Sequence, residues 1–112
     1  MKPSPFDPAP ILAAQVFAAL GDRTRLSLLA KLGDGQARSI AVLSTDTALT
    51  RQAITKHLHV LQDAGLVASL RVGRESRFAA RLETLDEARA YLDRVSRHWD
   101  DTLGRLKAFV ED

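Results

Sequence analysis

The stretch Thr50–Val67, TRQAITKHLHVLQDAGLV, places hydrogen-bond donors ahead of regularly spaced apolar residues. At about 100° per residue, an α-helix gathers these apolar residues on one side. They are Ile54, Leu58, Leu61 and Gly65, flanked by Ala53, His57 and Val60. The polar residues share the opposite arc: Arg51, Gln52, Thr55, Lys56, His59, Gln62 and Asp63. Because Thr50 is also suited to cap a helix, the stretch predicts an amphipathic helix with a polar outer face.

Two interpretations of that outer face are open. A polar helical face is usually only solvated, but the donors on these first turns also match the groups of a DNA groove. Arg51 and Gln52 have the forked geometry for bidentate hydrogen bonds to guanine and adenine edges. Lys56 and the hydroxyls of Thr50 and Thr55 suit phosphate oxygens. His59 lies one turn deeper and could contact either group, whereas His57 borders the apolar side and is expected to be a structural histidine.

The chain before this helix predicts an arm followed by three short helices. Residues 1–10, MKPSPFDPAP, hold all four prolines and are expected to form an extended, flexible arm. A first helix should follow to Leu20, and a second, over residues 23–32, should be capped by Asp22. The leucines expected to face inward from the second helix are Leu26, Leu28, Leu29 and Leu32. Ser39 is placed to cap a third helix that carries Ile40 and Leu43.

Beyond Gly65, two short segments rich in β-forming residues flank Gly73-Arg74, which is a hairpin signal. Arg71, Arg74 and Arg77 crowd the tip of this hairpin. Three short helices, a two-faced helix and a basic hairpin are the parts of a winged helix-turn-helix, a mainly α fold with a small β-hairpin wing. Clustered arginines repel one another unless a polyanion neutralises them. The combination favours double-stranded DNA as partner over a merely solvated face.

Composition narrows the function classes further. The 112 residues suit one domain, residues 11–112 after the arm, and the net charge is only +2. Residues 51–81 carry six bases and two acids, whereas residues 82–112 carry five bases and eight acids, so the positive charge is local. With no cysteine, the chain cannot form disulfides or thiolate metal sites. We expect no cofactor and no enzymatic activity, because no spacing suggests a catalytic base beside a nucleophile. We also expect no membrane segment and a cytoplasmic location, because the longest apolar stretch is too short to span a bilayer.

The last segment, about 85–110, lacks proline and predicts one long amphipathic helix. At 1.5 Å per residue it would be about 39 Å long, more than so small a domain covers alone. One interpretation is that its apolar stripe only covers the core of its own chain; the other is that it packs along a second copy in a homodimer. Adding the first helix, the residues expected at a dimer interface are Leu12, Val16, Leu85, Leu92, Val95, Trp99, Leu103, Leu106 and Phe109.

Three segments resemble the ArsR family of bacterial winged-helix repressors: LGDRTRLSLLAKL (20–32), RQAITKHLHVLQDAGLV (51–67) and VGRESRF (72–78). The resemblance covers nearly all of the chain from Ile11 onward. It implies a homodimer, joined by the first and last helices, that represses transcription from a roughly palindromic operator in its own or a neighbouring promoter. By position it places Thr50, Arg51, Gln52, Thr55, Lys56 and His59 on the recognition helix, and Arg74 and Arg77 on the wing.

The chain departs from the metal-sensing members of that family, whose sites use cysteines or paired histidine and carboxylate ligands. The best remaining pair, His98 with Asp101, is expected to be a solvated or interfacial feature, so no metal site is predicted. The chain is more similar to the metal-independent branch, with an effector still unidentified. A winged helix that binds proteins without reading DNA sequence remains the alternative function.

Overall fold

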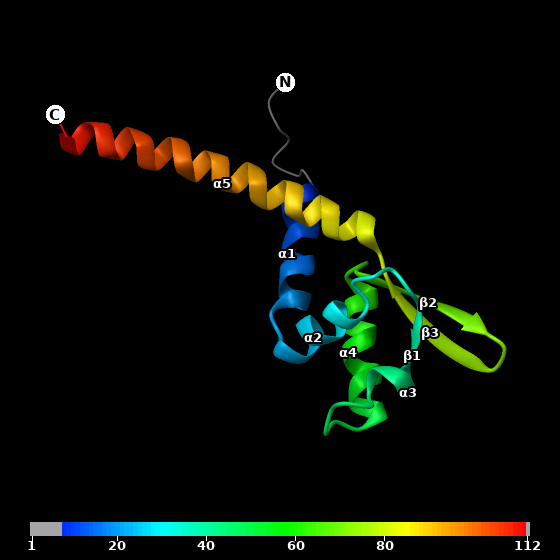
Figure 1. The fold of residues 1–112 in the computed structure, drawn as a ribbon. Helices are drawn as coiled ribbons and strands as arrows, with labels where there is room; N and C mark the ends of the chain where they lie inside the picture. The colour runs from blue at the N-terminus through cyan, green and yellow to red at the C-terminus, as the bar shows by residue number, and fades with distance from the viewer. Residues whose placement is uncertain (1–7, 112) are drawn as a thin grey trace.

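A computed structural model describes the backbone of residues 8–111 and the side chains from Leu12 to Glu111. Five helices and one three-stranded antiparallel sheet make up this part of the chain (Figure 1). In chain order the elements are α1 (Pro8–Leu20), α2 (Arg23–Lys31), β1 (Arg38–Ser39), α3 (Ile40–Leu43), α4 (Arg51–Asp63), β2 (Val67–Val72), β3 (Glu75–Ala80) and α5 (Leu82–Glu111). The mainly helical fold with a small hairpin that the sequence predicts is therefore confirmed.

The ends of several helices differ from the prediction. Helix α2 ends at Lys31, one residue early, and α4 ends at Asp63, before Gly65. Helix α1 begins at Pro8, so residues 8–10, expected in the arm, belong to a helix; residues 1–7 lie outside the described part. Proline is tolerated in the first turn of a helix because the first N–H groups have no helical partner. Helix α5 begins at Leu82, three residues earlier than expected, and continues to Glu111.

The core lies where α1, α2 and α4 meet the base of the hairpin. Its most deeply buried large side chains are Leu28, Leu32, Leu43, Ile54, Leu58, Leu61, Leu66 and Val67. Leu26 is a correction, because it was expected to face inward but is 52% exposed. At about 100° per residue it lies about 160° around α2 from Leu28, so the two cannot share one face.

The sheet has the order β1-β3-β2, and strands β2 and β3 form the predicted hairpin. Val72 pairs with Glu75 across the two-residue turn Gly73-Arg74. Gly73 has a φ of +64°, and a glycine with positive φ in the first turn position is what a type II′ turn requires. The two-residue strand β1 was not predicted; it pairs Arg38 and Ser39 with Phe78 and Arg77 of β3.

Helix α5 gives the molecule its elongated shape. It passes over the end of α1 and continues well beyond the body of the molecule, by which we mean the packed helices α1 to α4 and the base of the sheet. The hairpin projects from the other side (Figure 1). The principal extents are 66 × 32 × 22 Å and the radius of gyration is 18.4 Å, against about 13 Å for a compact domain of this length. Within residues 8–111, each helix is too short or too polar to cross a lipid bilayer.

Candidate nucleic-acid interface

The start of α4 is set by Thr50. Its hydroxyl accepts a hydrogen bond from the backbone N–H of Ala53 at 3.1 Å, which is the predicted N-cap. The hydroxyl proton of Thr50 is still available for an outside acceptor, and the residue is exposed. The first turn after it therefore begins at a fixed point, and Arg51 and Gln52 of that turn are exposed.

The two faces of α4 separate as predicted. Ile54, Leu58 and Leu61 are at most 1% exposed and pack into the core, which fixes the rotation of the helix. The exposed side chains of the opposite face include Arg51, Gln52, Lys56 and His59. Thr55 differs from these residues, because it is only half-exposed and its hydroxyl donates to the backbone oxygen of Arg51 at 2.7 Å. That hydrogen bond uses the proton that a phosphate contact would need.

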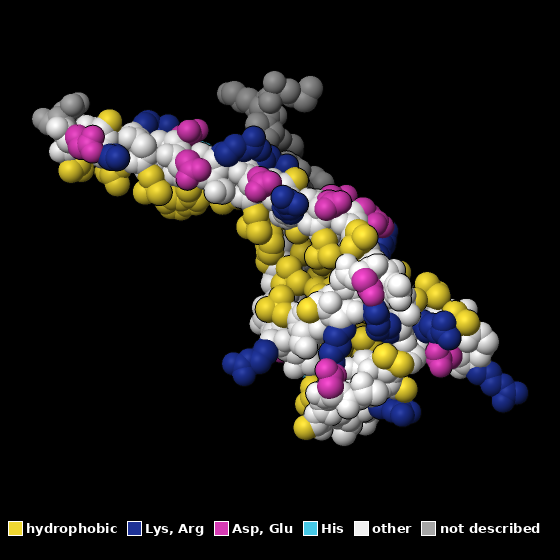
Figure 2. Space-filling model, viewed as in Figure 1, with side chains coloured by type: hydrophobic (Ala, Val, Ile, Leu, Met, Phe, Trp, Pro, Cys, Tyr) yellow, Lys and Arg dark blue, Asp and Glu magenta, His cyan; other side chains and the backbone are white. Residues whose placement is uncertain are grey.

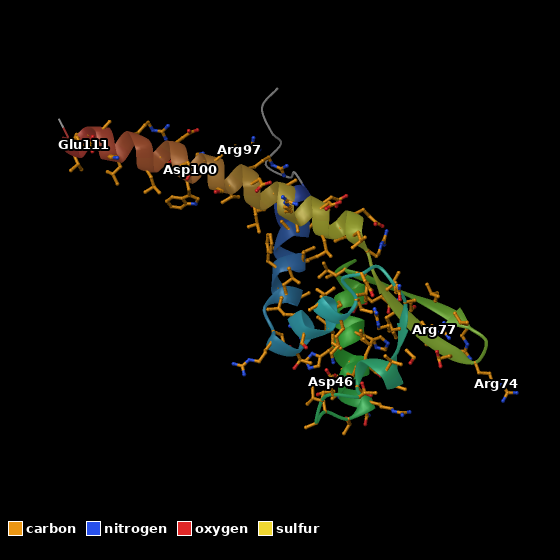
Figure 3. All side chains as sticks on the ribbon, in the orientation of Figure 1. Asp46, Arg74, Arg77, Arg97, Asp100 and Glu111 are labelled. Carbon is orange, nitrogen blue, oxygen red and sulfur yellow. The ribbon has the colours of Figure 1, made fainter. Side chains whose placement is uncertain are left out.

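Lysine and aspartate side chains hold the turn before α4. Lys31 of α2 donates to the backbone oxygen of Leu43 at 3.2 Å and pairs with the carboxylate of Asp46. This contact lowers the pKa of Asp46, chiefly through the hydrogen bond from Lys31. The labelled Asp46 lies at the end of the molecule opposite α5 (Figure 3). Helices α2 and α3 are thereby tied to the loop that leads into α4.

A second set of polar contacts connects α4 to α1 and α2. Arg25 donates to the backbone oxygen of Ala19 at 2.5 Å, and its Nη1 lies 3.3 Å from Nδ1 of His57. The carboxylate of Asp22 caps α2 by accepting the N–H of Arg25 at 3.0 Å. That bond, helped by the charges of Arg25 and His57, lowers the pKa of Asp22. His57 therefore has the structural position predicted for it, beneath α4 and away from the outer face.

The hairpin carries the second group of predicted contacts. Arg74 lies at its tip and points away from the body (Figure 3), and both it and Arg71 are exposed. Arg77 is half-buried and donates to Glu75 at 2.7 Å, so one of the three arginines has a carboxylate on its own strand. This pair reduces the repulsion at the tip that the sequence suggested.

The cations of the two elements remain unpaired within the described residues. No carboxylate there lies within 4.0 Å of the charged groups of Arg51, Lys56, Arg71 or Arg74. Unpaired cations on one helix face and on an adjacent hairpin form a surface that attracts a polyanion. A helix face and a β-ribbon are also the elements that enter or flank a DNA groove.

The residues predicted for a dimer interface differ in how far the single chain exposes them. Val16 is 7% exposed, and the partly buried Leu85 packs against the core, so contacts within the single chain cover much of both side chains. Periodicity detects burial but does not show whether the partner is the same chain or another copy. Val95 is half-exposed. The other six are more than half exposed: Leu12, Leu92, Trp99, Leu103, Leu106 and Phe109.

Sequence reasoning missed one basic residue beside α4. Arg23, at the start of α2, is exposed and shares a hollow with Thr47 and Ile54, next to the turn that leads into α4. The sequence did contain a signal for this exposed position, because Arg23 directly follows the capping residue Asp22 and so lies in the first turn of α2. His98 and Asp101 are exposed on α5, and the described residues contain no cluster of three or more potential metal ligands.

Comparison with known proteins agrees with this geometry. A family described as a helix-turn-helix domain matches residues 20–69, which span α2 to the start of β2. An uncharacterised HTH-type transcriptional regulator of Bacillus subtilis, YuzN, is 45% identical over an alignment of 65 residues, and the match covers 53% of this chain and 71% of that protein.

Solved structures extend the similarity to nearly the whole chain. An ArsR-like transcriptional regulator from Rhodococcus sp. RHA1 has a TM-score of 0.78 and 41% identity, covering 89% of this chain and 93% of that one. A homodimeric winged helix-turn-helix DNA-binding domain from Mycobacterium bovis, a possible ArsR-family regulator, has a TM-score of 0.64 and 26% identity, covering 87% and 91%. With the outward face of α4 and the basic wing, these similarities identify the chain as a member of the ArsR family of winged helix-turn-helix, DNA-binding transcriptional regulators.

Proposed function

We propose that the chain is a homodimeric repressor that binds a roughly palindromic operator in its own or a neighbouring promoter. In this proposal α5 joins the two copies and each α4 enters a major groove. The location is cytoplasmic, with the DNA, and the chain has no catalytic role. An effector that lowers the affinity for the operator is part of the proposal.

The row of apolar side chains along α5 is the observation that most strongly supports the dimer. Its first members, Leu85 and Ala88, pack against the body of the same chain. The row then continues past the body, where Trp99 is 58% exposed and Phe109 is 81% exposed. Figure 2 shows these hydrophobic side chains gathered along one side of the projecting helix. An exposed apolar row of this length usually marks a protein interface, and the homodimeric Mycobacterium bovis neighbour supports a second copy as the partner.

Two-fold symmetry then relates the two α4 helices to DNA. Successive major grooves on one side of a duplex are about 34 Å apart, so a dimer can place one recognition helix in each. The proposed contacts are Arg51 and Gln52 to bases, and Thr50, Lys56, Arg71 and Arg74 to phosphates. His59 would contact either group, and Thr55 and Arg77 are weaker candidates because each already donates within the chain.

Footprinting of the region upstream of the chain's own gene, and of the neighbouring genes, tests the proposal. The expected result is two protected half-sites, related by a two-fold axis, with centres about one helical turn apart. Transcription from that promoter in vitro should fall as the protein is added. A single asymmetric footprint, or protection without any fall in transcription, would contradict the homodimeric repressor.

A further inference from the structure

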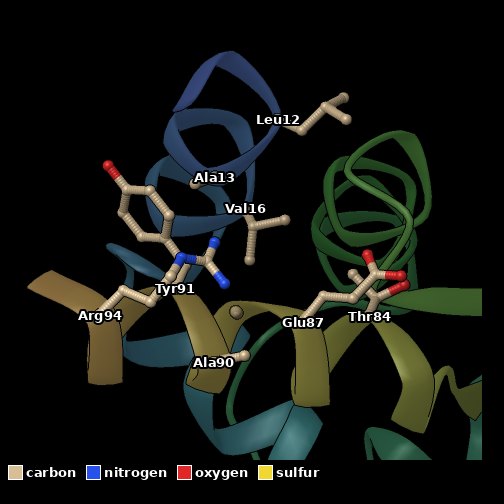
Figure 4. A pocket seen from close by; sticks show the side chains of 9 residues that line it. Leu12, Ala13, Val16, Thr84, Glu87, Ala90, Tyr91 and Arg94 are labelled. Atoms are coloured by element: carbon tan, nitrogen blue, oxygen red, sulfur yellow. The ribbon is translucent and has the colours of Figure 1, made fainter. Parts of the chain in front are cut away.

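A cavity of about 270 Å³ lies between α1 and α5, close to where α5 leaves the body (Figure 4). Its walls from α1 are Leu12, Ala13 and Val16. Helix α5 contributes the rest of the lining, namely Thr84, Glu87, Ala88, Ala90, Tyr91 and Arg94. The volume is close to the lower end of the range for small-molecule sites, and most of the lining is apolar, as such sites usually are.

The two charged residues of the lining face the cavity from different sides. Arg94 and Glu87 are seven residues apart on α5, which is about 10 Å along the axis. In Figure 4 the guanidinium of Arg94 points into the cavity beside Val16, and the carboxylate of Glu87 lies near Thr84 on the other side. The described residues place no carboxylate within 4.0 Å of the Arg94 guanidinium, so the two residues do not neutralise each other.

Aromatic contacts hold Arg94 in this position. Its guanidinium carbon lies 5.7 Å from the centre of the Tyr91 ring, within the range of a cation–π interaction. The Tyr91 ring in turn lies 6.1 Å from the ring of Phe17 on α1, tilted by 44°. Arg94 is exposed, but its guanidinium lies against Tyr91, the residue of α5 that contacts α1 through Phe17.

We propose that this cavity binds a small single-ring organic acid that carries a hydrogen-bond donor opposite its carboxylate. Arg94 is exposed at the edge of this mostly apolar cavity and has no carboxylate partner among the described residues, so it can bind such an acid by donating two parallel N–H groups to the carboxylate oxygens. The ring would rest against Leu12, Ala13 and Val16, and the donor would reach Glu87.

The position of the cavity connects binding to DNA affinity, a step that rests on the proposed function. Helix α5 carries the dimer contact and α1 belongs to the body that holds α4. A ligand that binds one arrangement of α1 and α5 more tightly shifts the population toward that arrangement. If that arrangement holds the two α4 helices at the wrong spacing for DNA, the ligand lowers the affinity for the operator. The operator then lowers the affinity for the ligand by the same factor.

Calorimetry of the full chain without DNA tests the site, with 4-hydroxyphenylacetate as the probe. Two matched compounds separate its parts: 4-hydroxyphenylacetamide lacks the negative charge and phenylacetate lacks the donor. We expect saturable binding of the probe. Because the amide loses hydrogen bonds between charged groups, it should bind at least about tenfold more weakly, and phenylacetate should bind more weakly than the probe.

Three variants locate the binding. Arg94→Gln should remove the preference for the acid over the amide. Arg97→Gln is the matched control, since Arg97 is on the same helix but lies on the side away from the body (Figure 3), and it should keep that preference. Ala90→Leu, at an exposed helical position that lines the cavity, should fill the space and weaken both ligands. Circular dichroism checks that each variant is folded.

Absence of saturable binding to the native chain would overturn the proposal. This holds also if the reason is that a second copy of the chain fills the cavity. Equal binding by the native chain, Arg94→Gln and Ala90→Leu would overturn it as well. Because calorimetry is done without DNA, its result does not depend on the proposed function. If the probe binds as expected but no operator is bound, the repressor proposal fails and the ligand site stands.

Discussion

Among the proposed DNA contacts, Arg51 is expected to contribute most to recognition of the operator sequence. It is exposed on the first turn of α4 and makes no ion pair within the described residues. Arg51→Ala should cost about 1–3 kcal/mol of binding free energy on the operator and relax sequence preference. Fluorescence anisotropy with operator and scrambled duplexes measures both effects. An equal loss on the two duplexes would assign Arg51 to phosphates.

Arg74, at the tip of the wing, should act on all sequences alike. Each phosphate contact contributes about 0.9 to the slope of log affinity against log salt concentration. A dimer has two copies of Arg74, so Arg74→Ala should reduce that slope by about two. Titrations of operator and scrambled DNA at several salt concentrations measure it. An unchanged slope would remove Arg74 from the interface.

Asp22 should give the folded protein part of its acid sensitivity. Its pKa is lowered in the fold, first by the N–H of Arg25, so its stabilising contribution is present above its ordinary pKa of about 3.9 and is lost as pH falls through the lowered value. The variant Asp22→Asn keeps a capping oxygen but has no charge to titrate. Urea denaturation from pH 7 down to pH 3 should show a smaller loss of stability for the variant. Parallel pH profiles for the two proteins would contradict this account.

At the scale of single elements, the free part of α5 should hold the dimer together and leave the body unaffected. Leu106 is 57% exposed in the single chain, so Leu106→Glu should reduce the mass in light scattering from two chains to one 12.3 kDa chain without unfolding it. Loss of bivalent binding should then lower operator affinity on the order of a hundredfold or more. Arg97→Glu, on the outer side of the helix, is the matched control and should remain dimeric. A dimeric Leu106→Glu protein would place the interface elsewhere.

The elements that the sequence predicted well are those with local signals. The start of helix α4 was predicted because Thr50 caps it and its apolar period is regular, whereas its end was not, since Gly65 was expected on the apolar side but lies beyond Asp63 with a φ of +78°. Strand β1 was missed, because two residues show no alternation, and Ser39 was recognised only as the cap of α3. The inward orientation of Leu26 was wrong because four leucines in seven residues do not fit on one face of a helix.

The candidate site was predictable in its residue types more than in its contacts. Exposure of Arg51, Gln52 and Lys56 follows from the helical period, which the sequence contains. The hydrogen bond of Thr55 to Arg51 and the ion pair between Arg77 and Glu75 depend on side-chain conformations, which a periodic pattern does not determine. The cavity between α1 and α5 joins residues far apart in the sequence, so only the packed structure brings Val16 and Arg94 together.

In the complete assembly, two copies joined through α5 should hold their α4 helices one DNA turn apart. The chain has no cysteine, so Asp63→Cys, at the exposed end of α4, provides a single attachment point for a spin label in each copy. Electron–electron dipolar spectroscopy of the operator complex then measures the separation directly. We predict one distance population near one helical turn of DNA, about 34 Å. No dipolar signal, or a separation so short that the two helices face each other, would contradict the account.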